Sequence, residues 1–154
     1  MVDDLNLEEK ESATLQTGFL RLEWNTAYEC GNLQIDEQHQ NLFKLANMLL
    51  TAMIAPQEKA VCHQYIEALI SDISKHFKTE EQLIEEAGYP HTEEHRQIHK
   101  KLTNDALKIA RHHKTGRLKI AEVFHFLAME VVSQHMLNED RKFFAYFQDS
   151  RKQK

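Results

Sequence analysis

Apolar side chains recur every three or four residues along four long stretches of this 154-residue chain. That spacing places them on one face of an α-helix, so each stretch predicts an amphipathic helix. Helix stop signals follow the first three stretches: Pro56, a Gly-Tyr-Pro turn at residues 88–90, and Thr115-Gly116. The predicted helices cover residues 35–55, 59–87, 92–114 and 117–148.

Short connections between successive helices favour antiparallel neighbours. We therefore predict an all-α fold, an antiparallel up-down-up-down four-helix bundle with an N-terminal extended arm. Residues 1–17 are polar and predict a flexible arm, residues 18–150 the bundle domain, and residues 151–154 a frayed tail. Residues 18–34 carry Phe19 and Trp24, so we expect them to pack across the end of the bundle.

Charge and composition exclude several classes of protein. The net charge is −5 and the basic residues are scattered, so we expect no nucleic-acid partner and no anionic membrane surface. No apolar run is long enough to span a bilayer, and the acidic N-terminus does not resemble a signal peptide. We expect a cytoplasmic protein in which Cys30 and Cys62 are free thiols.

The chain contains ten histidines, and several of them fall on the predicted apolar faces. His76 and Glu80 are four residues apart, and so are His95 and His99, which puts both members of each pair on one side of a helix. Buried polar groups of this kind cost several kcal/mol unless they are paired, and a metal ion would pair them. Nitrogen and oxygen ligands suit iron, manganese, zinc or copper, among which the pattern does not choose. The candidate ligands on these faces are His39, His76, Glu80, His95, His99 and His135.

The fourth helix offers two carboxylates as a further ligand. Glu139 lies four residues after His135, on the same side of an α-helix. Asp140 lies five residues after it, about 140° around an ideal helix. Helical spacing therefore favours Glu139.

From Trp24 to Asp140 the sequence resembles the hemerythrin family, and in particular its single-domain bacterial members. The motifs that carry the resemblance are Trp24-x3-Tyr28-x2-Gly31-x3-Ile35-Asp36-Glu37-Gln38-His39, His76-Phe77-x2-Glu80-Glu81, Tyr89-Pro90, His95-x3-His99 and His135-x4-Asp140. In that family the carboxylate lies five residues after the last histidine, so the resemblance selects Asp140 over Glu139.

The resemblance also implies a cofactor and a function. It implies two iron ions joined by an oxo or hydroxo bridge and by Glu80 and Asp140. Three histidines would bind one iron, and His39 and His76 would bind the other, which keeps an open position for O2. The implied function is reversible O2 binding for storage, delivery or scavenging, not enzymatic catalysis. The three histidines of the first iron would be His95, His99 and His135.

Apolar residues one turn from the ligands would form the O2 pocket. Where hemerythrins commonly have Trp, four residues before the last histidine, this chain has Val131. A smaller side chain predicts a cavity and faster oxidation of the iron. The expected pocket residues are Leu42, Phe77, Ile98, Leu102, Val131 and Met136.

Two other functions stay open at this point: a di-iron enzyme (peroxidase, oxidase or nitric-oxide handling), and an O2 or redox sensor with a separate partner. Gln38 and Glu81 adjoin predicted ligands and are candidates to orient them, although surface positions are as compatible with the pattern. The remaining histidines are not expected to touch the metal of this cluster: His63, His91, His112, His113 and His125.

Overall fold

The computed structural model describes residues 21–54 and 59–147, and the described part of the chain contains helices and no strands. A short 3-10 turn, η1 (Thr26–Tyr28), precedes three long helices, α2 (Leu33–Ile54), α3 (Lys59–Glu86) and α4 (Thr92–Lys114). These three agree with the predicted ranges to within two residues. The expected arm at residues 1–17 and tail at residues 151–154 lie outside the described residues.

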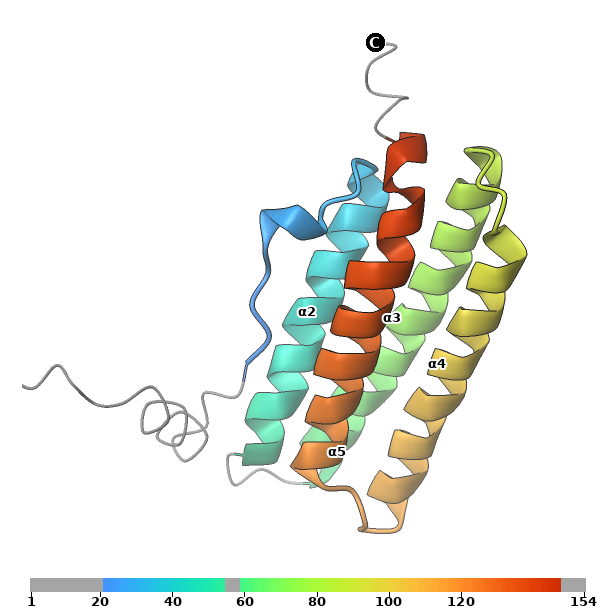
Figure 1. Cartoon of the computed structure of the whole chain (residues 1–154). Helices are drawn as coiled ribbons and strands as arrows, with labels where there is room; N and C mark the ends of the chain where they lie inside the picture. Colours follow the sequence, from blue (N-terminus) through green and yellow to red (C-terminus); the bar gives the residue numbers. More distant parts are fainter. Residues whose placement is uncertain (1–20, 55–58, 148–154) are drawn as a thin grey trace, which may run out of the picture.

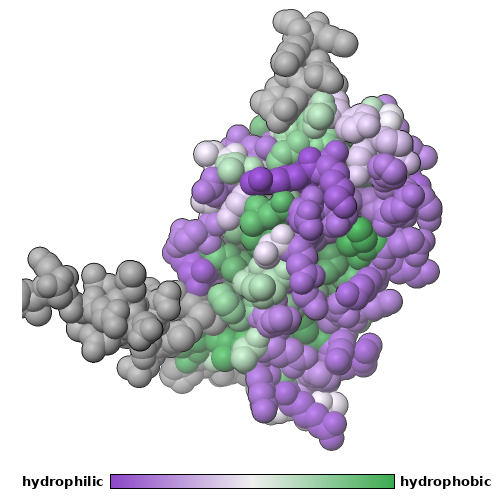
Figure 2. Space-filling model, in the orientation of Figure 1, coloured by the Kyte–Doolittle hydropathy of each residue, from purple (hydrophilic) through white to green (hydrophobic). Residues whose placement is uncertain are grey.

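The four-helix bundle is confirmed. In Figure 1, α2, α3, α4 and a fourth helical rod run side by side, and each reverses the direction of the one before it. α2 packs on α3, α3 on α4, and the fourth rod contacts both α4 and α2, which closes the bundle. Seen from the same side, hydrophobic residues gather over α2 and the fourth rod, with hydrophilic residues around them (Figure 2).

The fourth rod is not the single regular helix that the sequence predicts. It begins as α5 (Ile120–His125), widens into the π-helix η2 (Phe126–Glu139), tightens into the 3-10 turn η3 (Asp140–Phe143), and stays helical to residue 147. A π-helix forms its hydrogen bonds between residues five apart, not four. At its end the backbone N–H of Asp140 donates to the carbonyl of His135. Residues five apart therefore lie one turn apart here.

Glycines end the two middle helices. Gly88 and Gly116 have φ values of 82° and 70°, in the left-handed region that side chains with a Cβ rarely adopt. Beyond Gly88 the backbone N–H of Tyr89 donates back to the Ile84 carbonyl at 2.9 Å. The reversal places the start of α4 directly beside the end of α3, and both of these helix ends carry predicted ligands.

The bundle has two separate apolar cores. The larger contains seventeen buried residues, among them Leu50, Ile66 and Leu127. The smaller lies at the end of the bundle where α2 begins and α3 ends, and its buried members are Cys30, Ile35, Ile84, Tyr89, Phe143 and Phe147. Along each helix the predicted ligands lie near the boundary between the two cores, so a polar layer lies where the cores meet.

Before α2, the chain from Leu22 to Tyr28 runs along the side of that helix, not across the end of the bundle as expected. Cys30 is buried at that end, and Phe19 lies outside the described residues. The Asn47 side chain accepts a hydrogen bond from the Leu22 N–H at 2.7 Å and donates to the Leu22 carbonyl at 2.9 Å. Two residues further on, the Trp24 ring meets the Phe43 ring edge to face, with centroids 5.2 Å apart. These contacts fix the path of the segment along α2.

No helix of the described residues is both long and apolar enough to cross a membrane.

Candidate metal centre

The structure brings all seven predicted ligands together in the polar layer between the two cores. α2 contributes His39, α3 contributes His76 and Glu80, and α4 contributes two histidines. The fourth rod contributes one from η2 and a carboxylate from the first residue of η3. Each of the seven side chains is at most 3% exposed. The members from α4 and the fourth rod are His95, His99, His135 and Asp140.

Glu80 lies at the centre of the cluster and faces two groups of histidines. Its Oε1 is 2.7 Å from His95 Nε2 and 3.0 Å from His99 Nε2. Its Oε2 is 3.0 Å from His76 Nε2 and 3.3 Å from His39 Nε2. One carboxylate oxygen is therefore directed at each group, the arrangement that a carboxylate needs to join two metal ions.

Asp140 faces the same two groups from the opposite rod. Its Oδ1 is 3.1 Å from His95 Nε2 and 3.0 Å from His135 Nε2, and its Oδ2 is 3.4 Å from His39 Nε2. Glu139, which α-helical spacing favoured, points elsewhere: its side chain is 26% exposed and accepts hydrogen bonds from Lys142. The spacing argument was wrong because it assumed an α-helix where the chain forms η2.

The donor atoms fall into two overlapping groups of unequal size. One contains three histidines and both carboxylates, and the other contains two histidines and Glu80. Within each group the candidate ligand atoms lie within 4.8 Å of one another, close enough to share one ion. The smaller group has one histidine fewer than the larger. The members of the larger group are Glu80, His95, His99, His135 and Asp140, and those of the smaller are His39, His76 and Glu80.

Several buried polar atoms in this cluster have no hydrogen-bond partner. Among the cluster's inward-facing atoms these are the Nε2 atoms of His39 and His76, Oε2 of Glu80, and both carboxylate oxygens of Asp140. Buried polar atoms are nearly always satisfied in folded proteins, and leaving one unpaired costs about 1–3 kcal/mol. Cations bound among these atoms would satisfy them together, so the residues fit a metal centre.

The pKa values of the cluster reflect strong coupling between its carboxylates and imidazoles. Burial opposes ionisation of Glu80, but His76 and His39 outweigh it and hold the pKa of that carboxyl well below its ordinary value. Burial lowers the pKa of His95, yet Asp140 and Glu80 together raise it to about 10. Without a metal, His95 therefore holds a proton and the two carboxylates are negatively charged, whereas burial lowers the pKa of His76.

Hydrogen bonds behind the cluster orient two of the histidines. His76 Nδ1 lies 2.8 Å from Gln38 Oε1, and His99 Nδ1 lies 2.8 Å from Glu81 Oε1. Each bond leaves Nε2 directed inward and fixes the ring orientation, as outer partners of metal-bound histidines do. The Nδ1 atoms of His39 and His135 have no such partner in the described structure.

Apolar side chains cover the side of the cluster that faces the larger core. The Phe77 ring stacks on the His99 ring, with centroids 3.8 Å apart and planes 6° from parallel. Four of the six expected pocket residues are buried, whereas Ile98 and Val131 are half-buried. The buried four are Leu42, Phe77, Leu102 and Met136.

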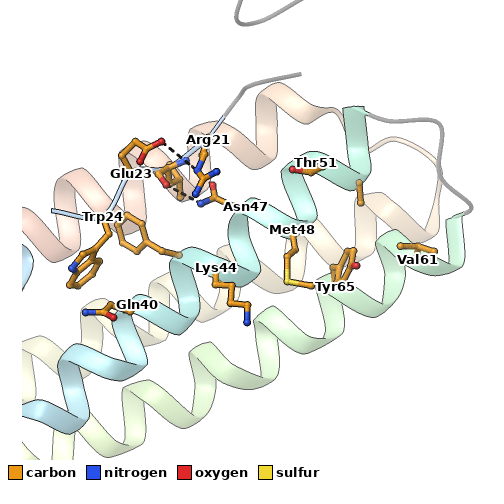
Figure 3. A pocket seen from close by; sticks show the side chains of 13 residues that line it. Arg21, Glu23, Trp24, Gln40, Lys44, Asn47, Met48, Thr51, Val61 and Tyr65 are labelled. Carbon is orange, nitrogen blue, oxygen red and sulfur yellow. Dashed lines mark hydrogen bonds and ion pairs between the residues drawn. The ribbon is translucent and has the colours of Figure 1, made fainter. Parts of the chain in front are cut away.

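Several grooves open on the surface near these helices, and those of about 350 Å³ and 400 Å³ reach His76 and His95. One, of about 460 Å³, lies between α4 and η2 and reaches His135, with Ile98 and Leu102 in its wall. A larger one, of about 640 Å³, lies along α2 beside the Arg21–Glu23 ion pair and contains none of the predicted ligands (Figure 3). The groove along α2 is therefore separate from the metal centre.

Two features that support the site were not predicted from the sequence. The side chain of buried Asp36 accepts hydrogen bonds from the backbone of Cys30 at 2.8 Å and of Gly31 at 3.3 Å, which holds the turn before α2. The Phe143 ring packs against His95 with centroids 5.4 Å apart. The position of Asp36, an acidic residue in the first turn of a helix, is the sequence signal for its hydrogen bonds. The contact between Phe143 and His95 could not be predicted, because it depends on how η2 and η3 are wound.

An all-α bundle that encloses a cluster of histidines and carboxylates has the architecture of the helical-bundle metal proteins. A family model described as the hemerythrin HHE cation binding domain matches residues 31–151. Because this match covers most of the 154 residues, the chain belongs to the hemerythrin family.

Individual relatives agree with this assignment. A bacteriohemerythrin from Stenotrophomonas maltophilia is 35% identical over 78 residues, which are 51% of this chain and 50% of that protein. A hemerythrin-like protein from Naegleria gruberi is 31% identical over 84 residues, 54% of this chain and 65% of that protein. A bacteriohemerythrin from Campylobacter jejuni is 23% identical over 118 residues, 75% and 86% of the two chains. The chain thus spans about half the length of the first of these curated relatives.

A solved structure supports the fold. The crystal structure of a leucine-to-phenylalanine mutant superposes with a TM-score of 0.71 at 22% sequence identity. The superposition covers 82% of this chain and 96% of the other. At this identity the likeness bears on the fold alone.

Proposed function

We propose that this protein binds O2 reversibly at a non-haem di-iron centre. The observation that carries the proposal is the unequal division of donors around Glu80: three histidines on one side and two on the other. A site with fewer protein ligands keeps a position for an external molecule, which separates a reactive metal site from a structural one. In this proposal, Glu80 and Asp140 join the two ions together with an oxo or hydroxo bridge.

The pair of irons would supply the electrons that hold O2, and the protein controls what else reaches it. The buried side chains of Leu42, Phe77 and Leu102 exclude water from the side facing the larger core. None of these side chains can donate a proton, so they offer no acid for cleaving a bound O–O bond. Such surroundings favour a carrier over an oxidase.

Reduction without oxygen, followed by exposure to air, tests the proposal. We expect two irons per chain and a visible charge-transfer band that appears with O2 and disappears when O2 is removed. One zinc per chain and no colour would contradict the iron assignment. A coloured form that decays irreversibly on first contact with O2 would contradict reversible binding.

The groove between α4 and η2 favours a second candidate function. It reaches His135 and has the polar residues Gln134 and Asn138 in its wall, so a small polar substrate could approach the centre from this side. In that case the protein would be a di-iron peroxidase or would handle nitric oxide. Rapid turnover of hydrogen peroxide by the iron-loaded protein would support this alternative, and slow turnover beside a stable oxygenated form would exclude it.

A further inference from the structure

A second group of histidine and carboxylate side chains lies at the other end of the bundle from the cluster. His63 and Glu67 are on the first half of α3, and His113 is in the last turn of α4. His63 precedes His76 by thirteen residues on the same helix, which corresponds to about 20 Å along its axis. This group is therefore independent of the buried centre.

His63 contacts each of the other two side chains, and the ligand atoms of the three have to move closer together to share one ion. The rings of His63 and His113 lie 5.9 Å apart, centre to centre, and are within 16° of parallel. His63 Nε2 lies 4.0 Å from Glu67 Oε1, one helical turn further on. The side chains of His63 and Glu67 are 47% and 57% exposed, so they can rotate toward a shared ion without repacking the core.

Neighbouring histidines do not offer the same set of donors. His112 is held by Glu122, with His112 Nδ1 2.6 Å from Glu122 Oε1. His91 and Glu94 form another exposed pair, 3.8 Å apart, and the ring beside His91 is that of Tyr89. Two imidazoles from different helices distinguish the group of His63, Glu67 and His113.

We propose that His63, Glu67 and His113 bind a divalent transition-metal ion of the zinc and copper type. Two imidazoles and one carboxylate are three ligands that suit Zn²⁺, with water in the remaining position. The negative end of the α4 dipole lies at His113 and adds to the attraction for a cation. The bound ion would link α3 to α4 on the outside of the bundle, and the proposal does not depend on the O2 chemistry.

Imidazole ligands also predict the order of metals. Affinity follows Cu²⁺ above Zn²⁺, whereas the hard ions Mg²⁺ and Ca²⁺ prefer sites made of oxygen ligands. We therefore expect a large excess of Mg²⁺ or Ca²⁺ to leave the bound Zn²⁺ in place.

Calorimetric titration with Zn²⁺, on protein without a polyhistidine tag, tests the site. Wild type and variants are compared at equal iron content, so that ions entering the buried centre cancel. We expect wild type to bind one Zn²⁺ more per chain than His63→Gln or His113→Gln, or to bind it at least about tenfold more tightly. Glutamine is a good helix former, so these changes preserve α3 and α4. His91→Gln is the matched control and should bind as wild type does.

Thermal unfolding provides a second readout. Zn²⁺ should raise the melting temperature of wild type and of His91→Gln but not that of His113→Gln, because the ion links two helices. Equal Zn²⁺ binding by wild type and His113→Gln would overturn the proposal. Displacement of the ion by Mg²⁺ would also overturn it.

Discussion

At the scale of single residues, the side chain that matters most is the carboxylate at the end of η2. Asp140 is 1% exposed and faces both histidine groups, while its neighbour Glu139 is half-buried and pairs with Lys142. The two adjacent acids point in different directions because successive residues face different sides of a helix. They provide a matched pair for testing the site.

Asp140→Asn should weaken metal binding at least about tenfold, since it removes one of the two carboxylates that face both groups. Glu139→Gln should leave the metal content unchanged, because Glu139 contacts Lys142 on the surface. Metal analysis after dialysis against a weak chelator measures both. Loss of metal in Glu139→Gln with retention in Asp140→Asn would contradict the assignment.

Glu81 is expected to strengthen metal binding through His99. Glu81→Gln replaces a charged acceptor at His99 Nδ1 with a neutral one, so the affinity for metal should fall about 10–100-fold. The rate of iron release to a chelator measures the change. Glu85→Gln is the control, since Glu81 and Glu85 both pair with Arg96 but only Glu81 contacts a cluster histidine. Equal release rates from the two variants would contradict this role.

At the scale of helices and turns, the sequence predicts most of the fold but not the winding of the fourth rod. Gly88, Gly116 and the apolar spacing locate α2, α3 and α4 well, because these signals act locally along the chain. The path of Leu22 could not be predicted, since it depends on Asn47, twenty-five residues away. The π-helix was missed because a period of 3.6 was assumed throughout.

The same difference explains how much of the site the sequence could predict. His76 and Glu80 lie four apart on a regular helix, where spacing and geometry agree, and so do His95 and His99. Asp140 follows η2, where a turn contains more residues, so only the family resemblance selected it. That these residues bind metal remains a prediction.

Val131 on η2 is the place where a bulkier side chain should slow oxidation of the iron. It is half-buried, packs against the larger core and lies four residues before His135, so Val131→Trp would place a bulkier ring near the cluster. We expect the variant to autoxidise several-fold more slowly than wild type, measured from the decay of the oxygenated spectrum. Met129→Trp, which adds the same ring at a position that is 47% exposed, should leave the rate unchanged. Equal rates in wild type and Val131→Trp would disprove the idea.

At the scale of the whole molecule, metal binding should be linked to pH. In the metal-free protein the pKa of His95 is raised to about 10, so its imidazole is protonated at neutral pH, and the pKa values of His39 and His99 are raised as well. A metal binds only neutral imidazole, so it must displace these protons. Ferrous iron added to a weakly buffered solution at neutral pH should therefore release at least one proton per chain.

The sign of this linkage is also testable. Because protons and metal compete for the same nitrogens, the affinity for metal should rise with pH across the neutral range. A chelator competition at several pH values measures it. An affinity that stays constant, or binding without proton release, would contradict the protonated state of the cluster.

The polar layer between the two cores divides the bundle into two ends. Among the described residues, the larger core holds seventeen buried side chains and the smaller one six. The end with the smaller core therefore has less buried apolar surface to stabilise it. Without a cation, the layer between the two cores contains several buried polar atoms that have no hydrogen-bond partner. Hydrogen exchange on metal-free protein should therefore show the end around Ile84 and Phe143 opening first, and metal should protect it most. Metal binding would then be the event that stabilises this end of the bundle.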